Sequence, residues 1–343
     1  MPIATKVADG LTVSPGPGTP QSAPLAGSPF DLASDDRYLL WRERKLTRYP
    51  LCAESLRVPI VNMMALTEAE RAAIVAVCQR ANMAIYTPEC TSVDQPGGSS
   101  TAKSEISRDA ARLGLRALAT AFGLGSMETH RSADADGIVA IEVTDQASKR
   151  GFIPYSSKPL SWHTDGYYNG PEDVVRSMLL HCVRPASEGG ENALLDPEIV
   201  YIRLRDESPA LAAAMMHPEA MRIPASVDDE GKERPESVGP VFGFDPTVPG
   251  ALAMRYTSRK RNISWRNDPD TTAARELIDN LLAGSAEPLI IRTRLAAGEG
   301  LISNNVLHAR TSFAVAEAAA VAPKTCAGRL LYRARYSQRI AGT

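Results

Sequence analysis

The sequence predicts a mainly β protein with flanking helices, built as a β-sandwich or barrel. From Leu160 onward, short runs of apolar and β-branched residues follow one another at lengths typical of strands. Helical patterns are few, and they do not alternate with strands as they would in βαβ units. With 343 residues and 44% hydrophobic side chains, the chain can enclose one large core. We therefore expect one domain rather than two.

This domain is expected to occupy residues 31–343. Residues 1–30 are rich in Pro, Gly, Ser and Ala and contain few large apolar side chains, which predicts a disordered tail. Within the domain, a part with helices and strands over 31–150 precedes a strand-rich core over 151–343. Helical patterns interrupt the core, so we expect an insert at about 197–285.

Helices are predicted where apolar residues recur at spacings of three and four. Thr67 and Glu70 form a capping-box pattern ahead of an apolar series that includes Ile74. A second helix is predicted over about 107–122, with Gly123 as its end. The remaining helical patterns span residues 197–216 and 271–282.

Strands are predicted for apolar runs of strand length. The stretch over residues 226–240, SVDDEGKERPESVGP, has no apolar period and is predicted to be a polar loop. The predicted strands cover residues 83–86, 138–143, 174–183, 252–256, 289–295, 301–306 and 330–336.

Charge and composition exclude several classes of partner and location. The net charge of −2 argues against nucleic acid or an anionic membrane as a partner. No apolar run approaches the ~20 residues of a membrane span, and the first residues do not resemble a secretory signal. Because the cysteines are odd in number and show no C-x-x-C spacing, we expect a reduced cytoplasmic protein without a disulfide framework. The cysteines are Cys52, Cys78, Cys90, Cys182 and Cys326.

His163 and Asp165 stand two residues apart in a predicted strand, so both side chains would point to one face. With His308, which follows a later strand, they supply the two imidazoles and one carboxylate of a non-haem Fe(II) site. Such a triad leaves one face of the metal open for a cosubstrate and O₂. A His-x-Asp pair also arises by chance, and a lone histidine after a strand is more often structural. His130, His181 and His217 are interpreted as structural or exposed.

Two arginines in the last predicted strand could bind an anion. Arg329 and Arg333 are four residues apart, so both would lie on one face, and a guanidinium binds a carboxylate with two hydrogen bonds. Arg329 could therefore anchor the distal end of a dicarboxylate cosubstrate. Salt-bridged arginines on an exposed strand are the alternative. A further basic cluster is interpreted as a solvated face, or as a partner of the acidic residues 228–233, and consists of Arg255, Arg259, Lys260, Arg261 and Arg266.

Four fragments, in order along the chain, carry a resemblance to a known family: SWHTDGYYN, GGEN, GEGLISNNVLHARTSF and GRLLYRARY. Together they resemble the taurine dioxygenase/TfdA-like family of Fe(II)/2-oxoglutarate oxygenases, which includes clavaminate synthase-like and γ-butyrobetaine hydroxylase-like enzymes. The resemblance runs from about residue 151 to residue 335 and is weak before residue 130. It implies a double-stranded β-helix (jelly roll) core, which agrees with the strand-rich pattern.

The resemblance also implies roles for individual residues. His163, Asp165 and His308 would be the catalytic iron ligands, and Arg329 would hold the distal carboxylate of 2-oxoglutarate. Asn192 falls where many members have Thr or Ser beside that carboxylate, and its amide can donate a hydrogen bond there. The remaining match is Arg333, which in sulfonate-using members contacts the substrate or the keto-acid cosubstrate.

The reaction that the resemblance implies uses Fe(II), 2-oxoglutarate and O₂ to hydroxylate a small-molecule C–H bond, with release of succinate and CO₂. Because Asp165 is present, halogenation is disfavoured, whereas desaturation or another oxidative rearrangement stays an alternative. A jelly-roll binding protein that has lost catalysis is a second alternative. A cupin-like enzyme is disfavoured, since its histidines would cluster in a short span. Whether the protein forms a homo-oligomer is not determined by the sequence.

The substrate is not determined by these patterns. Arg333, together with Arg310, would favour an anionic group, whereas a tyrosine cluster could bind a quaternary ammonium by cation–π attraction. Packing against neighbouring strands is an equally good interpretation for each tyrosine. The residues near the metal motif that could line a substrate pocket are Tyr155, Lys158, Tyr167, Tyr168 and Asn169.

Overall fold

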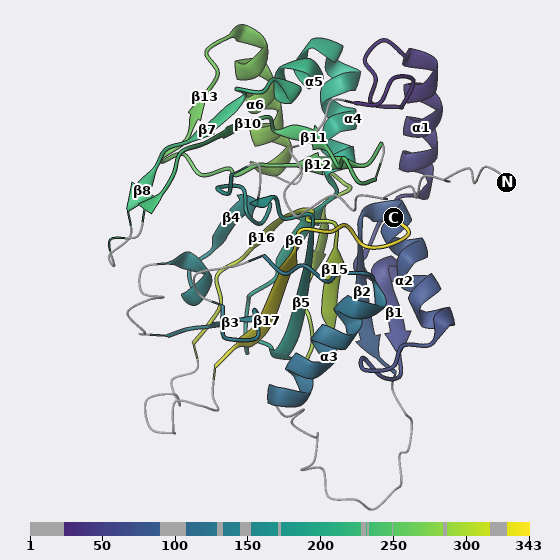
Figure 1. Cartoon of the computed structure of the whole chain (residues 1–343), viewed down its shortest axis with the longest axis vertical. Helices are drawn as coiled ribbons and strands as arrows, with labels where there is room; N and C mark the ends of the chain where they lie inside the picture. The colour runs from purple at the N-terminus through teal and green to yellow at the C-terminus, as the bar shows by residue number, and fades with distance from the viewer. Residues whose placement is uncertain are drawn as a thin grey trace, which may run out of the picture.

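The protein is built around two β-sheets that pack against each other (Figure 1). The computed structural model describes residues 24–89, 108–128, 133–144, 152–170, 173–227, 231, 233–248, 250–283, 287–315 and 328–343. The larger sheet contains, in spatial order, β1 (Arg57–Ile60), β2 (Met83–Pro88), β15 (Gly300–Ser303), β5 (Ser177–Arg184), β17 (Leu330–Tyr336) and β3 (Val139–Glu142). The smaller sheet contains β14 (Ile291–Thr293), β6 (Asn192–Leu195), β16 (Leu307–Arg310) and β4 (Leu160–His163).

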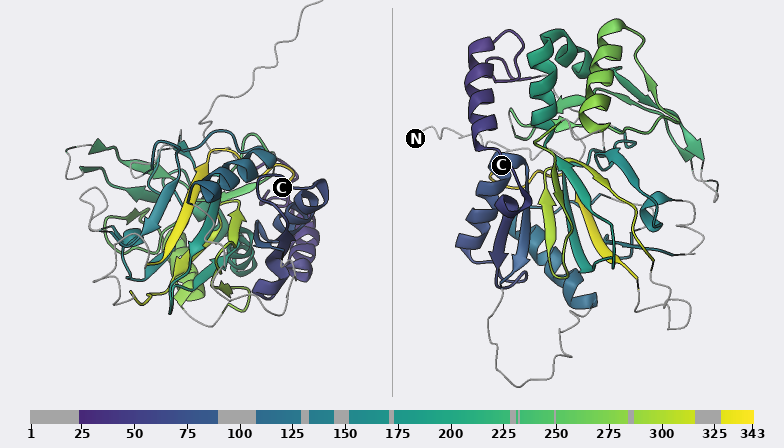
Figure 2. Two further views of the ribbon diagram at one scale, coloured as in Figure 1. Left: turned by 90° about the horizontal axis from the view of Figure 1, so that it is seen from below. Right: turned by 180° about the vertical axis from the view of Figure 1, so that it is seen from behind.

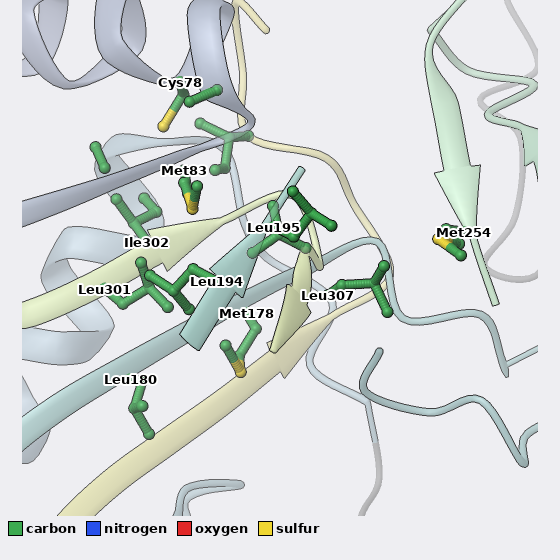
Figure 3. Close-up of a cluster of buried hydrophobic side chains, with 14 of the residues drawn as sticks. Cys78, Met83, Met178, Leu180, Leu194, Leu195, Met254, Leu301, Ile302 and Leu307 are labelled. Atoms are coloured by element: carbon green, nitrogen blue, oxygen red, sulfur yellow. The ribbon is translucent and has the colours of Figure 1, made fainter. Parts of the chain in front are cut away.

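Antiparallel pairing dominates both sheets, and among the described strands only β1 and β2 pair in parallel. The two sheets share one cluster of buried hydrophobic side chains, in which Leu194 and Leu307 of the smaller sheet lie with Leu180 and Leu301 of the larger one (Figure 3). Strand β17 is buried along its whole length on both faces. One of those faces carries Arg333 and therefore places a cation inside the protein.

Helices cover the larger sheet and form one end of the molecule (Figures 1 and 2). Helix α2 (Glu68–Ala81) begins with the predicted capping box, in which Thr67 and Glu70 exchange hydrogen bonds, and it packs on β1 and β2. Helix α3 (Arg108–Ala121) packs on β5. The helices that form one end of the molecule are α1 (Asp35–Arg48), α4 (Pro197–Glu207), α5 (Pro209–Met216) and α6 (Pro269–Ala283) (Figure 1). Two 3₁₀ turns cover Ala53–Leu56 and Ile153–Tyr155.

Short strands accompany α4 to α6 in the segment where an insert was expected. The prediction of a polar loop over residues 226–240 is wrong, because β10 in this stretch pairs with β7, and β8 pairs with β9. These strands are only two or three residues long, too short for a polar–apolar alternation to be visible in the sequence. The strands are β7 (Met221–Ile223), β8 (Ser226–Val227), β9 (Glu233–Arg234), β10 (Ser237–Gly239), β11 (Phe242–Phe244), β12 (Leu252–Met254) and β13 (Ser264–Trp265).

The N-terminal part contains features that the sequence patterns did not predict. Helix α1 and strand β1 belong to this part, and Phe30, at the end of the predicted tail, is 1% exposed. Its ring lies against Trp41 and Tyr201, with ring centroids 4.9 and 5.1 Å away. Cys52, Cys78 and Cys182 are free thiols, and the other two cysteines fall outside the described residues. None of the helices in the described part of the chain is long and apolar enough to cross a membrane.

Candidate metal centre

The two histidines of the predicted triad face each other across neighbouring strands. His163 ends β4, and its Cα partner in the antiparallel pairing is His308 of β16. The ring centroids are 4.3 Å apart. One ligand atom from each histidine and one carboxylate oxygen of Asp165 all lie within 4.8 Å of one another. The structure therefore brings together the three residues that the sequence predicted as a metal site.

Both imidazole rings are held in the same way, through a backbone carbonyl two residues earlier. His163 Nδ1 lies 2.9 Å from the carbonyl oxygen of Ser161, and His308 Nδ1 lies 2.9 Å from that of Val306. A hydrogen on Nδ1 satisfies each carbonyl and leaves Nε2 with a free lone pair, as metal-binding histidines require. Burial, together with nearby His308, lowers the pKa of His163 to about 3, which keeps that ring neutral at physiological pH.

Asp165 reaches the site from a turn, not from the strand. Strand β4 ends at His163, so the argument from strand spacing is wrong for the carboxylate, although the two side chains do lie close together. A turn follows at Gly166, whose φ is +69°, and a Cβ added there would lie 2.5 Å from Cγ2 of Val175. The carboxylate is thus positioned by a tight turn that only a glycine fits without strain.

Asn305 fixes that turn and was not assigned a role from the sequence. Its side-chain oxygen accepts the Asp165 N–H at 2.8 Å, and its Nδ2 donates to the carbonyls of Asp165 and Val175 at 2.9 and 2.8 Å. The residue adopts a left-handed conformation with φ +50°, which Asn tolerates better than most residues. The sequence shows two asparagines shortly before His308, but it does not predict a role for Asn305, because the partners Asp165 and Val175 are distant in sequence.

The Asp165 carboxylate is buried between two arginines. Its Oδ1 lies 2.9 Å from Nη1 of Arg333 and 3.7 Å from Nη1 of Arg335. Its buried Oδ2 has no hydrogen-bond partner among the residues that the structure describes. Burial alone would raise the pKa of Asp165, but the arginines hold it below its usual range. An ionised oxygen without a partner, next to two free imidazole nitrogens, is the donor set expected for a divalent metal such as iron.

The segment after Asp165 is bound to residues 221–256, which lie within the segment predicted to be an insert. The backbone carbonyls of residues 167–169 accept hydrogen bonds, in order, from Arg255 at 2.8 Å, Arg234 at 3.2 Å and the Ser237 hydroxyl at 2.6 Å. Arg255 also donates to other carbonyls of the insert. The interpretation of Arg255 as part of a solvated basic face is therefore wrong, since its guanidinium is enclosed by backbone oxygens.

The predicted substrate residues occupy different environments. The Tyr167 ring lies edge-on to His163, with centroids 6.2 Å apart. The Tyr168 hydroxyl accepts a hydrogen bond from Arg335 at 3.2 Å, and Tyr155 is 5% exposed within the hydrophobic core. A cavity of about 200 Å³ between the core and the insert is lined by Asp165, Tyr167 and Asn169, among others, but not by the other two tyrosines.

Arg329 lies in a second, smaller pocket, which Asn192 also lines. It is 8% exposed, and within the described ranges no side chain or carbonyl forms an ion pair or hydrogen bond with its guanidinium. Burial lowers the pKa of Arg329 to about 10, so it stays charged at neutral pH. A buried cation without a partner is costly unless an anion binds it, which makes this pocket a candidate carboxylate site.

Arg310 is not available to an anion. Its Nη2 donates to the carbonyls of Ser156 and Lys158 at 2.9 and 2.5 Å, and Lys158 itself is exposed. Among the other histidines, His181 is buried and its Nδ1 lies 3.0 Å from the Tyr86 hydroxyl, which agrees with a structural role. His217 Nδ1 accepts a backbone N–H at 3.1 Å, and residue 130 lies outside the described residues.

Comparisons with known proteins show which sequences and structures this chain resembles. The sequence model of the family described as "Taurine catabolism dioxygenase TauD, TfdA family" matches residues 108–334. A uridine-5'-phosphate dioxygenase from Amycolatopsis is 26% identical over 52% of the chain, and the match spans 60% of that relative's own length. A protein of the same name from Streptomyces is 30% identical over 58% of the chain and 72% of its own length.

Solved structures with a similar fold include two oxygenases. An asparagine oxygenase in complex with Fe(II), 3-hydroxyasparagine and succinate aligns with a TM-score of 0.51 and 16% identity, over 80% of this chain and 81% of that one. The non-heme iron oxygenase OrfP, with Fe, succinate and hydroxy-arginine, aligns with a TM-score of 0.51 and 16% identity, over 79% and 80% of the two chains. At this identity the likeness establishes a shared fold.

Proposed function

Because the chain belongs to the taurine catabolism dioxygenase TauD, TfdA family, we propose that it is an Fe(II)- and 2-oxoglutarate-dependent dioxygenase that hydroxylates a C–H bond of a small molecule. The observation that carries this proposal is the buried cluster of His163, Asp165 and His308, whose ligand atoms lie within 4.8 Å of one another. The two packed sheets are, in this proposal, the halves of a double-stranded β-helix. Residues 31–343 form one domain, with the insert at about 197–285.

The iron ligands are Nε2 of His163, Nε2 of His308 and Oδ2 of Asp165. This assignment is supported by the carbonyl contacts that occupy both Nδ1 atoms and by an Oδ2 that accepts no hydrogen bond from the described part of the chain. When bound, iron and 2-oxoglutarate supply the activation of O₂, with oxidative decarboxylation of the cosubstrate to succinate and CO₂. Arg333 holds the other carboxylate oxygen, so that Asp165 presents one oxygen to the metal.

The distal carboxylate of 2-oxoglutarate binds Arg329, with Asn192 beside it. The charge of Arg329, its burial and its lack of an ion-pair or hydrogen-bond partner among the described residues support this role. A dicarboxylate would neutralise the guanidinium through a bidentate contact that lysine could not reproduce. Arg333, which contacts Asp165, is next to the metal and is a candidate for orienting the keto-acid end or the substrate.

The substrate is a small molecule that approaches beside Tyr167. Because two relatives are named uridine-5'-phosphate dioxygenases, uridine-5'-phosphate is the first compound to test. The commitment of Arg310 to backbone carbonyls weakens its expected role as an anion site. Desaturation and other oxidative rearrangements use the same ligand set, and product analysis distinguishes them from hydroxylation.

Iron and cosubstrate binding test this function directly. We expect anaerobic addition of 2-oxoglutarate to the Fe(II)-loaded protein to produce a weak visible charge-transfer band, and O₂ then to yield succinate. His163→Ala and Asp165→Ala should weaken iron binding by more than the roughly 10–100-fold that the loss of an outer-shell partner costs. His217→Ala is the matched control and should bind iron as the wild type does. Without a band or succinate, the chain would be a binding protein instead.

A further inference from the structure

Phe313 lies where the Arg329 pocket meets the metal-bearing sheet. The guanidinium carbon of Arg329 lies over the Phe313 ring, 5.2 Å from its centroid. The corresponding carbon of Arg310 lies over the same ring at 4.8 Å. One aromatic ring therefore contacts two buried cations. Among the described residues, Phe313 is the only aromatic side chain that contacts the Arg329 guanidinium.

The second cation is rigidly held. Arg310 donates to the carbonyls of Ser156 and Lys158, so it cannot move away from Arg329. Burial and the charge of Arg329 lower the pKa of Arg310 to about 10. The two guanidinium groups repel each other, and the negative face of the aromatic ring between their contacts offsets part of that cost.

The backbone around Phe313 is fixed to the turn that precedes Asn192. The N–H of residue 190 donates to the carbonyl of Ser312 at 2.9 Å, and the N–H of Ala314 donates to the carbonyl of Glu188 at 3.1 Å. Gly189 forms an isolated bridge with Phe313. A Cβ at Gly189 would lie 2.3 Å from the Ser312 oxygen, so only glycine permits this close approach.

Gly190 completes the contact. Its φ is +70°, and a Cβ there would lie 3.5 Å from Nε of Arg329 and 3.5 Å from Cβ of Phe313. The two glycines thus let the Phe313 segment and the Arg329 side chain approach the same turn. The GGEN fragment and the HARTSF fragment, far apart in sequence, meet at one arginine.

We propose that Phe313 is a positioning residue for the cosubstrate: it holds the Arg329 guanidinium, by a cation–π contact, in the orientation that binds the distal carboxylate of 2-oxoglutarate. This inference rests on the proposed function, in which Arg329 receives that carboxylate. It assigns Phe313 to cosubstrate selection rather than to the metal or the primary substrate. The role requires an aromatic ring, so a tyrosine should serve and a leucine should not.

The test is an anaerobic equilibrium titration of the Fe(II)-loaded protein with 2-oxoglutarate. Phe313→Leu is expected to raise the Kd for 2-oxoglutarate about tenfold, the effect of losing one desolvated cation–π contact. Phe313→Tyr should stay within about twofold of the wild type. Iron affinity and the midpoint of urea unfolding should be the same in all three proteins. 2-Oxobutyrate, which has no distal carboxylate, should bind the wild type and Phe313→Leu equally.

Two results would overturn the role of Phe313. One is wild-type affinity of Phe313→Leu for 2-oxoglutarate, and the other is an equal loss of affinity for 2-oxobutyrate, which would indicate a general disturbance. If Phe313→Leu does not fold, Phe313→Tyr and Phe313→His still compare rings of different strength, and equal Kd values for both would overturn the role as well. A wild-type protein that does not bind 2-oxoglutarate would instead overturn the proposed function.

Discussion

At the scale of single residues, the metal centre depends on side chains that never touch the metal. Asn305 binds both backbone polar groups of Asp165 and the carbonyl of Val175. It also adopts a φ of +50° next to the strand that carries His308. One side chain therefore sets the distance between the carboxylate and an imidazole that come from different parts of the chain.

Asn305→Ala should weaken iron binding about tenfold, the effect typical of a lost outer-shell partner. It should also destabilise the fold by about 2–3 kcal/mol, because buried hydrogen-bond groups of the Asp165 turn lose their partner. Equilibrium iron titration and urea unfolding measure the two effects. Asn304→Ala, which removes contacts to Asn82 and Thr343, is the neighbouring control and should leave iron affinity unchanged. Equal iron binding by Asn305→Ala would contradict the positioning role.

At the scale of elements, strand β15 can lie between β2 and β5 because residue 300 is a glycine. Tyr86 of β2 and His181 of β5 pair with Gly300 on either side of it, and their side chains hydrogen-bond at 3.0 Å across that strand. A Cβ at Gly300 would lie 2.1 Å from the Tyr86 hydroxyl oxygen. The hydrogen bond between Tyr86 of β2 and His181 of β5 can therefore cross β15 only if β15 has no side chain at this position.

Gly300→Ala is expected to lower the free energy of unfolding by about 2–4 kcal/mol, since it combines overpacking with loss of a buried hydrogen bond. Gly125→Ala is the matched control, because nothing lies within 4 Å of a Cβ at Gly125 and its φ is not in the left-handed region. Urea unfolding of both variants gives the comparison. A Gly300→Ala protein as stable as the control would show that the strands can separate locally.

The insert is the other element that bears on the site, through the three carbonyls of residues 167–169. Arg255→Ala should free the Tyr167 carbonyl and leave several carbonyls of the insert without a donor. We expect faster backbone hydrogen exchange at residues 167–169, with iron affinity preserved. Arg222→Ala removes an exposed ion pair of the same small sheet and should not change exchange at these residues. Equal exchange in the two variants would mean that the insert does not hold this segment.

Short-range patterns were enough to predict the capping box of α2 and the strand Leu330–Tyr336. The proposed triad needed the family resemblance as well, because His163, Asp165 and His308 lie in fragments that are each weak signals alone. Short-range patterns did not predict α1, because most of its residues are polar and only a few of its side chains are buried. They also did not predict the short strands over 226–240. The partners of Asp165 could not be predicted, because Asn305, Arg333 and the carboxylate meet only in the folded chain. The same applies to Arg255, since a guanidinium enclosed by carbonyls looks in sequence like any surface arginine.

At the scale of the whole molecule, a buried ion cluster connects the N-terminal helix to the core. Lys45 of α1 contacts Asp196 and Glu198 at 2.6 and 2.5 Å. Asn82, after α2, donates to Asp196 at 3.0 Å. Charges buried at this depth are tolerated only in pairs, so the position of α1 is specified by chemistry as well as by apolar packing.

Lys45→Ala should lower the free energy of unfolding by about 3–5 kcal/mol, because it leaves two buried carboxylates without their cation. Arg71→Ala, which removes an exposed ion pair with Glu68, should leave the unfolding midpoint unchanged. The loss in Lys45→Ala should be smaller at acidic pH, where a carboxylate left without its cation can bind a proton. A Lys45→Ala protein with wild-type stability would mean that α1 is not coupled to the core.

The pairing of His163 with His308 also makes the metal site a property of the folded chain. The two strands that carry them are separated in the chain by β5, β6, β14 and β15, among other elements. A ligand set made from such distant segments is rarely preformed in an unfolded chain. A metal that binds only the folded state adds to its stability, so we expect Fe(II) to protect the protein against unfolding.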